Sequence, residues 1–288
     1  MAATRLVSDL LLPPGSQITI LGVLTPGQPP DESTLQAAMT KAEEILEGSA
    51  VKTQSILLHG HAAKKLIEYG SEDPPDLMVI GARGLYATLK ILLGGIAHQV
   101  VENARWPILV MRTPYRGLRR AILATEGSQN AGQAARYLAR FPLPEQIELQ
   151  VLHVQPHYSI LEEPAHRAYS LSRPIPFTAP MTPGPAEMGH LSPSADGREQ
   201  EGRTALDTAK KILQTTGRKV TTFLTQGDPA SEILAHSQSQ DIDLIVAGSR
   251  GLSAMEGWWW GSVSRKLVHY AQSSVLFVRT EAEDNNPE

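Results

Sequence analysis

The chain has 288 residues, a formal net charge of −4 at pH 7 and no cysteine. This length accommodates two domains of ordinary size, and the lack of cysteine excludes disulfides, thiolate catalysis and cysteine-ligated zinc. The small negative charge gives no electrostatic basis for binding nucleic acid or an anionic membrane, and no apolar run approaches the ~18 residues that span a bilayer.

The first half of the chain alternates predicted helices with short apolar strands. A helix is expected over residues 2–12, where Pro13-Pro14-Gly15 ends it. The elements expected after it are a strand at 17–23, a helix at 32–46, a strand at 51–58 and a helix at 62–69. A strand, a glycine turn, a helix and a last apolar strand follow within residues 76–112.

The second half has a similar order of elements. The pattern predicts strands at 120–125, 147–154 and 220–224, helices at 131–140, 203–215 and 231–236, and a polar tail at 281–288. Residues from 155 to about 196–200 are rich in proline and serine, and a long loop is expected there. Ser128 is expected to cap the helix near Ala131, and His153 to be a satisfied core residue.

The segment 243–279 repeats the segment 76–112. Gly248, Gly251 and Gly261 each lie 167 residues after Gly81, Gly84 and Gly94, in the same strand–turn–helix–strand context. A fixed offset across three glycines and their flanking elements indicates an internal repeat.

The first repeat lacks one strand. Val154 lies 131 residues after Val23, and the same offset puts the counterpart of strand 120–125 before Met1. Either the natural start lies further upstream, or the first repeat is degenerate. In the second case the neighbouring strands must pair directly, or another segment must fill the position. We expect that no strand of this repeat joins the strands near 18–23 and 77–81.

The glycine pattern Gly-x2-Gly-x9-Gly-Ser resembles that of the universal stress proteins, and the chain looks like a tandem of two such domains. The resemblance implies an α/β fold with two doubly wound parallel sheets, similar to adenine nucleotide alpha hydrolases, with strand order 3-2-1-4-5. The domains would span 1–114, truncated and degenerate, and 119–280, with the proline-rich insert at about 155–200. The final strands, 108–111 and 275–277, would pair in an intramolecular pseudo-dimer.

The family's nucleotide site maps onto the second repeat. The resemblance assigns phosphate binding to the glycine turn and helix start, and adenosine binding to the ends of two strands. The phosphate residues would be Gly248, Arg250, Gly251, Gly261, Ser262, Val263 and Ser264, and the adenosine residues Ala124, Thr125, Glu126 and Val154. Ser262 could also act as a helix N-cap. The family usually has aspartate where this chain has Glu126.

The first repeat is not expected to bind nucleotide. Gly95 and Ala97 stand where the second repeat has Ser262 and Ser264, so both hydroxyls are missing. The strand that carries the acidic residue is also missing.

The resemblance therefore implies a cytoplasmic stress-response sensor or regulator whose second repeat binds ATP or a related adenine nucleotide, with Mg²⁺. No general base, nucleophile or metal cluster is evident, so a binding protein is favoured over an enzyme. Two alternatives stay open, a nucleotide-independent scaffold with vestigial sites and a weak nucleotide hydrolase. Homodimerisation also stays open, and no nucleic-acid or membrane partner is expected.

Overall fold

The computed structural model describes residues 1–48, 51–82, 93–156, 195–249 and 261–279. The first repeat contains α1 (Ala2–Ser8), β1 (Gln17–Leu24), α2 (Glu32–Leu46), β2 (Lys52–His59), α3 (Ala62–Glu72), β3 (Met78–Gly81), α4 (Gly95–Asn103) and β4 (Ile108–Met111). The second contains β5 (Arg120–Ala124), α5 (Gln129–Arg140), β6 (Glu148–Gln155), α7 (Ala195–Gln214), β7 (Val220–Gln226), α8 (Pro229–Ser239), β8 (Leu244–Gly248), α9 (Ser262–Tyr270) and β9 (Ser274–Val278). Predicted site residues Arg250 and Gly251 lie outside the described residues, as does most of the insert.

The described strands form two sheets. A seven-stranded sheet has the order β3-β4-β9-β8-β5-β6-β7, and β1 and β2 form a separate parallel pair. Within the second repeat the order β7-β6-β5-β8-β9 is the predicted 3-2-1-4-5 arrangement, with every pair parallel. The predicted doubly wound α/β fold is confirmed.

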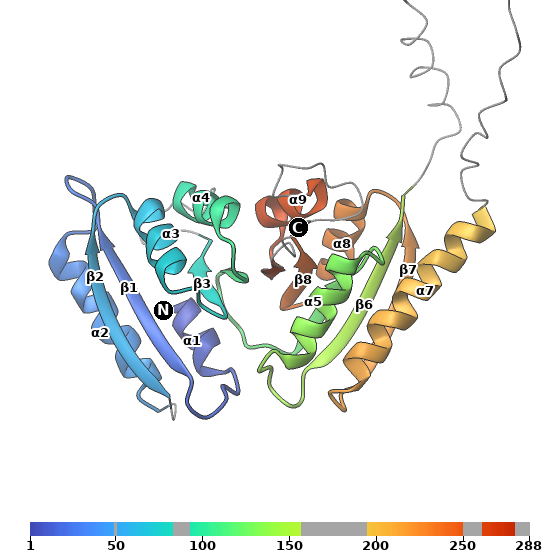
Figure 1. Ribbon diagram of the computed structural model, residues 1–288, viewed down its shortest axis with the longest axis horizontal. Helices are drawn as coiled ribbons and strands as arrows, with labels where there is room; N and C mark the ends of the chain where they lie inside the picture. Colours follow the sequence, from blue (N-terminus) through green and yellow to red (C-terminus); the bar gives the residue numbers. More distant parts are fainter. Residues whose placement is uncertain (49–50, 83–92, 157–194, 250–260, 280–288) are drawn as a thin grey trace, which may run out of the picture.

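Among the described residues of the first repeat, no strand occupies the central position, as expected. The structure assigns no strand between β1 and β3 among the described residues, and these two strands do not pair with each other. Figure 1 shows the β1–β2 pair at the left, apart from β3. The first repeat is therefore split between two sheets.

The repeats join through their last strands. β4 and β9 pair antiparallel, with Leu109 opposite Leu276 at the centre. These two residues are equivalent under the 167-residue offset, so the pairing has a local two-fold axis between them. The predicted pairing of the final strands is thus observed.

Helices cover both faces of the seven-stranded sheet (Figure 1). One apolar cluster joins the sheet to α3, α4, α8 and α9, and the other joins it to α1, α5 and α7. Each face of β5 consequently contacts a different set of helices, and only the strand ends and the loops beyond them remain for a ligand.

Local sequence explains three of the helix starts. Asp31, Ser128 and Asp228 accept hydrogen bonds from the backbone amides of Thr34, Ala131 and Ser231, and so cap α2, α5 and α8. The predicted cap by Ser128 is confirmed.

The largest errors in the predicted helix boundaries are at the end of α1 and the start of α7. Helix α1 ends at Ser8 instead of residue 12, because the Leu11 amide donates to the Pro142 carbonyl of the second repeat, 2.8 Å away. Helix α7 begins at Ala195, not at residue 203. Gly202 lies within it, where an added Cβ would come 2.9 Å from Cδ2 of His153, so this glycine permits close packing of α7 on β6.

Candidate functional site

The glycine turn of the second repeat is closed by backbone hydrogen bonds. The Ser249 amide donates to the Val278 carbonyl over 3.1 Å, and the Gly261 amide donates to the Ser249 carbonyl over 3.0 Å. These bonds hold the start of α9 directly beyond the end of β8. The first repeat has the same closure, in which the Gly94 amide donates to the Ala82 carbonyl over 2.7 Å.

Helix α9 begins without a side-chain cap. Its N-cap is Gly261, in contrast to the side chains that cap α2, α5 and α8. The amides of the first helical turn lack intrahelical acceptors and carry the positive end of the helix dipole. The start of α9 can therefore receive an anion such as phosphate.

The two serines of α9 have different environments. Ser262 is exposed in the first turn, and its predicted role as the N-cap is wrong, because Gly261 has the extended backbone of a cap residue, with φ −74° and ψ 156°. Ser264 is buried, and its hydroxyl donates to the Gly248 carbonyl over 2.9 Å. The hydroxyl proton of Ser264 is therefore used within the protein, whereas Ser262 faces solvent.

The predicted adenosine residues lie at the same sheet edge. Strand β5 pairs with β6 on one side and with β8 on the other, all in parallel. The Thr125 amide donates to the Leu152 carbonyl over 3.0 Å, which holds the end of β5 against β6. Ala124, Thr125, Val154 and Gly248 consequently share the carboxyl edge of three adjacent strands, where open α/β sheets bind ligands.

Glu126 follows β5 in a partly buried loop. Burial raises the pKa of its carboxyl group, while a hydrogen bond from the Ser128 hydroxyl opposes the shift. Gly127 adopts φ +84°, a conformation that favours glycine. Ser128 therefore orients the Glu126 carboxylate and also caps α5.

A cavity of about 400 Å³ opens beside this loop. It lies between the loop, the start of α5 and the middle of α7. Its lining residues are Thr125, Glu126, Gly127, Ser128, Ala131, Gly132, Gln200, Glu201, Thr204, Ala205, Thr208 and Ala209. Thr125 and Glu126 belong both to this cavity and to the predicted nucleotide site, whereas α9 covers the opposite face of the sheet. The sequence did not predict this cavity, because α5 and α7, which contribute most of its lining, are separated in the chain by β6 and the long insert.

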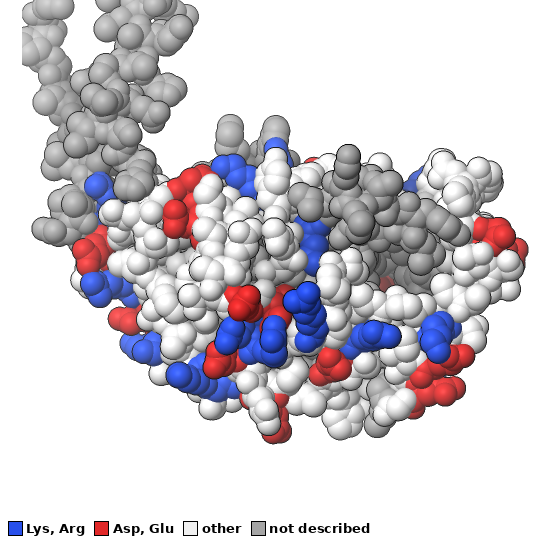
Figure 2. Space-filling view, turned by 180° about the vertical axis from the view of Figure 1, so that it is seen from behind, with Lys and Arg blue, Asp and Glu red and all other residues white. Residues whose placement is uncertain are grey.

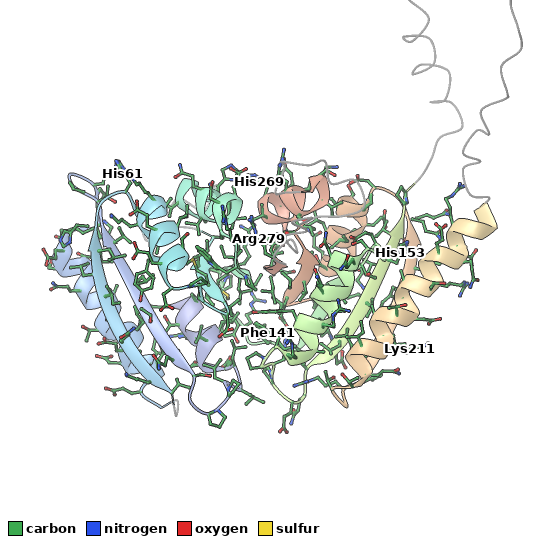
Figure 3. The ribbon with its side chains drawn as sticks, in the orientation of Figure 1. His61, Phe141, His153, Lys211, His269 and Arg279 are labelled. Atoms are coloured by element: carbon green, nitrogen blue, oxygen red, sulfur yellow. The ribbon has the colours of Figure 1, made fainter. Side chains whose placement is uncertain are left out.

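His153 lies on β6 against α7 (Figure 3). Burial lowers the pKa of its imidazole, and its Nδ1 atom has no hydrogen-bond partner within the described part of the chain. The prediction of a satisfied core histidine is therefore wrong for this nitrogen.

The first repeat has no matching hydroxyls. Ala97, 5% exposed, occupies the position of Ser264, and Gly95 begins α4 where Ser262 begins α9. Helix α4 resembles α9 in having a glycine N-cap, but no described strand beside β3 carries counterparts of Thr125 and Glu126.

Other kinds of site find no support in the described residues. They contain no cluster of three histidine, aspartate or glutamate side chains suited to a metal ion. None of the described helices is both long and apolar enough to cross a membrane. Figure 2 shows basic and acidic side chains interspersed over one face, without an extended surface of one sign.

Comparisons with known proteins agree with this architecture. The family model described as "Universal stress protein family" matches residues 2–112 and 176–279. A universal stress protein of Mycobacterium tuberculosis is 25% identical over 248 residues, covering 85% of this chain and 71% of that protein. A universal stress protein of Bacillus subtilis is 38% identical over 81 residues, covering 28% of this chain. The aligned part covers 55% of the Bacillus protein, about half of its length.

Solved structures show a similar fold. A universal stress protein from Archaeoglobus fulgidus gives a TM-score of 0.54 at 18% identity, covering 91% of this chain and 87% of that one. A functionally unknown protein from Pseudomonas aeruginosa gives a TM-score of 0.58 at 14% identity, covering 92% of this chain and 82% of that one.

Proposed function

This chain belongs to the universal stress protein family as a tandem of two repeats, and from that premise we propose that its second repeat binds ATP or a related adenine nucleotide. The bound nucleotide would make the protein a sensor or regulator in a cytoplasmic stress response.

One observation carries the proposal, namely the uncapped start of α9 beside the ends of β5, β6 and β8. Backbone amides of Ser262, Val263 and Ser264 are the donors expected for phosphate oxygens, and the exposed Ser262 hydroxyl adds another. Arg250 and Gly251, in the loop between β8 and α9, would complete the phosphate contacts. Mg²⁺ would be held by phosphate oxygens and the Ser262 hydroxyl, and would neutralise part of the phosphate charge.

The adenosine half of the ligand would lie over the ends of β5 and β6. Ala124 and Val154 are each 8% exposed, and supply apolar surface at this edge. The Glu126 carboxylate would accept a hydrogen bond from ribose or adenine. Because Ser128 already orients this carboxylate, the longer glutamate side chain can serve where the family usually has aspartate.

The test is a calorimetric titration of ATP with Mg²⁺ into the wild-type chain and two matched variants, Gly261→Asp and Gly94→Asp. Both glycines are extended N-caps, with φ/ψ of −74°/156° and −78°/154°, so aspartate fits either backbone. An aspartate at Gly261 would occupy the amides of α9 and repel phosphate.

We expect one site per chain, weakened at least about tenfold by Gly261→Asp and unchanged by Gly94→Asp. Two sites, or an effect of Gly94→Asp, would show that the first repeat binds nucleotide. No binding to the wild-type chain would refute the proposal and favour a nucleotide-independent scaffold.

A further inference from the structure

Two histidines from opposite repeats meet between α4 and α9. The imidazole rings of His98 on α4 and His269 on α9 have their centroids 5.2 Å apart and are inclined by 50°. Both side chains are partly buried, and Figure 3 shows His269 at the junction of the repeats. This ring contact therefore joins the two repeats through their helices, in addition to the β4–β9 strand pair.

The two histidines are not equivalent under the 167-residue offset. The counterpart of His98 is Arg265, and the counterpart of His269 is Glu102. The local two-fold axis thus relates the histidine contact to a second position, shared by Glu102 and Arg265. Histidine gains its charge between about pH 8 and pH 5, so mild acidification adds positive charge at the first of these positions.

His269 lies in a mainly positive environment. Burial lowers the pKa of its imidazole, and positive charge on His98, Arg112 and Arg265 lowers this pKa further. The carboxylate of Glu102 opposes the lowering, and it is the one carboxylate of the described residues whose charge acts on this imidazole. A proton on His269 is therefore less stable in the folded chain than in the unfolded chain.

This carboxylate lies next to the other histidine. Nε2 of His98 is 3.5 Å from Oε1 of Glu102, so a proton on His98 has a counter-charge on its own helix. Nδ1 of His98 is buried and has no hydrogen-bond partner within the described ranges. A second proton, on His269, meets the positive charges of His98 and Arg112 instead.

The elements packed around α4 and α9 add one more buried cation and two ion pairs. Arg279, which follows β9, is 8% exposed and donates to backbone carbonyls of α4. Asp228 of α8 is paired with Lys266 of α9, and Glu68 is paired with Lys65 within α3. Acidification therefore adds charge to a junction that already contains buried cations.

We propose that the contact between α4 and α9 is a pH-sensitive joint, closed while the two imidazole rings are neutral and opened when both are protonated. Two imidazolium ions at this separation, beside buried arginines, repel each other and separate the helices. Because the pKa of His269 in the folded chain is lowered from its ordinary value of 6.5, its contribution to stability is fully present above that pH and is lost as the pH falls below it.

The experiment measures the distance between α4 and α9. Since the chain has no cysteine, spin labels can be attached at Ile96→Cys on α4 and Tyr270→Cys on α9, where the native side chains are 51% and 61% exposed. Double electron–electron resonance should show one short distance at pH 7.5 and a second, longer distance at about pH 5. The ratio of open to closed joint should rise by up to about tenfold per pH unit, the limit for each proton taken up. Circular dichroism checks that the chain stays folded at both values.

Three variants test the assignment. In the labelled chain His269→Gln should abolish the longer distance, and Glu102→Gln should make it appear at higher pH, because the counter-charge is removed. Glu47→Gln, at an exposed glutamate at the end of α2, is the matched control and should change nothing.

The unlabelled chain gives an independent measurement. The urea midpoint should fall less between pH 7.5 and pH 5 in His269→Gln than in the wild type. A single distance at both pH values, a longer distance that persists in His269→Gln, or an unchanged response in Glu102→Gln would each overturn the proposal. No nucleotide is present in these measurements, so this proposal and the nucleotide proposal can fail separately.

Discussion

At the scale of single residues, the two serines of α9 have different expected roles, Ser262 in ligand binding and Ser264 in stability. Ser262→Ala removes an exposed hydroxyl beside the uncapped helix start, so ATP affinity should fall while the free energy of unfolding stays within about 0.5 kcal/mol of the wild-type value. Ser264→Ala removes the buried bond to the Gly248 carbonyl, and should cost about 1 kcal/mol or more.

Urea denaturation and calorimetric titration measure both effects. Ala97→Ser, at the equivalent position of the first repeat, is the control for adding a hydroxyl there. Equal loss of stability in both serine variants would contradict the division of roles.

The sequence predicted the role of a side chain correctly only where that role depends on residues nearby in the chain. The prediction that Ser128 is a cap is correct, because the residues directly after it begin helix α5. The cap of α9 was wrongly assigned to Ser262, since Gly261 can adopt the same extended conformation and precedes it. The unpartnered Nδ1 of His153 could not be predicted, because it depends on how α7 packs against β6 after a long insert.

At the scale of elements, two buried arginines bind the helices of opposite repeats. Arg112 follows β4 and donates to the Val268 carbonyl of α9 over 2.5 Å. Arg279 follows β9 and donates to the Val101 carbonyl of α4 over 2.7 Å. Each pair is equivalent under the 167-residue offset, so the contacts are reciprocal. Figure 3 shows Arg279 and His269 near the junction of the repeats.

Replacing either arginine should destabilise the junction. A cation at the carboxyl-terminal end of a helix also interacts favourably with its dipole. Arg112→Met and Arg279→Met are each expected to cost about 1.5–3 kcal/mol in urea denaturation, since each loses charged hydrogen bonds in a buried position. The exposed Arg203→Met change on α7 is a control expected to cost less than about 0.5 kcal/mol. Clearly different losses at Arg112 and Arg279 would contradict their reciprocal role.

Elements were predictable where short-range patterns determine them. The strands of the second repeat followed from its apolar runs, and their order from the resemblance to the universal stress proteins. The end of α1 was not predictable, because a hydrogen bond between Leu11 and Pro142 joins residues far apart in the sequence. The separation of β1 and β2 from the main sheet agrees with the expectation that no strand of the first repeat joins them to β3.

At the scale of the whole molecule, the β4–β9 pairing joins β3 and β4 of the first repeat to the sheet of the second repeat. Its centre is the pair Leu109 and Leu276, both fully buried and equivalent in the two repeats. A strand pair with this symmetry can form between two identical strands as well as between two similar ones. The second repeat has all five strands of the fold, and removal of β4 would leave β9 as a new edge strand, in addition to β7 at the other edge.

We therefore expect a fragment of residues 116–288 to form a homodimer through antiparallel β9 strands, with Leu276 facing its own copy. An uncovered apolar strand edge is a template for pairing, and the fragment would regain the buried surface that β4 supplies in the full chain. Leu276→Lys in the fragment should give a monomer, because two like charges would face each other across the new pair. Sedimentation velocity at micromolar concentration measures both states. A monomeric wild-type fragment would show that β4 holds β9 through contacts specific to the first repeat, such as the reach of Arg112 to α9, and that the local two-fold symmetry does not suffice for assembly.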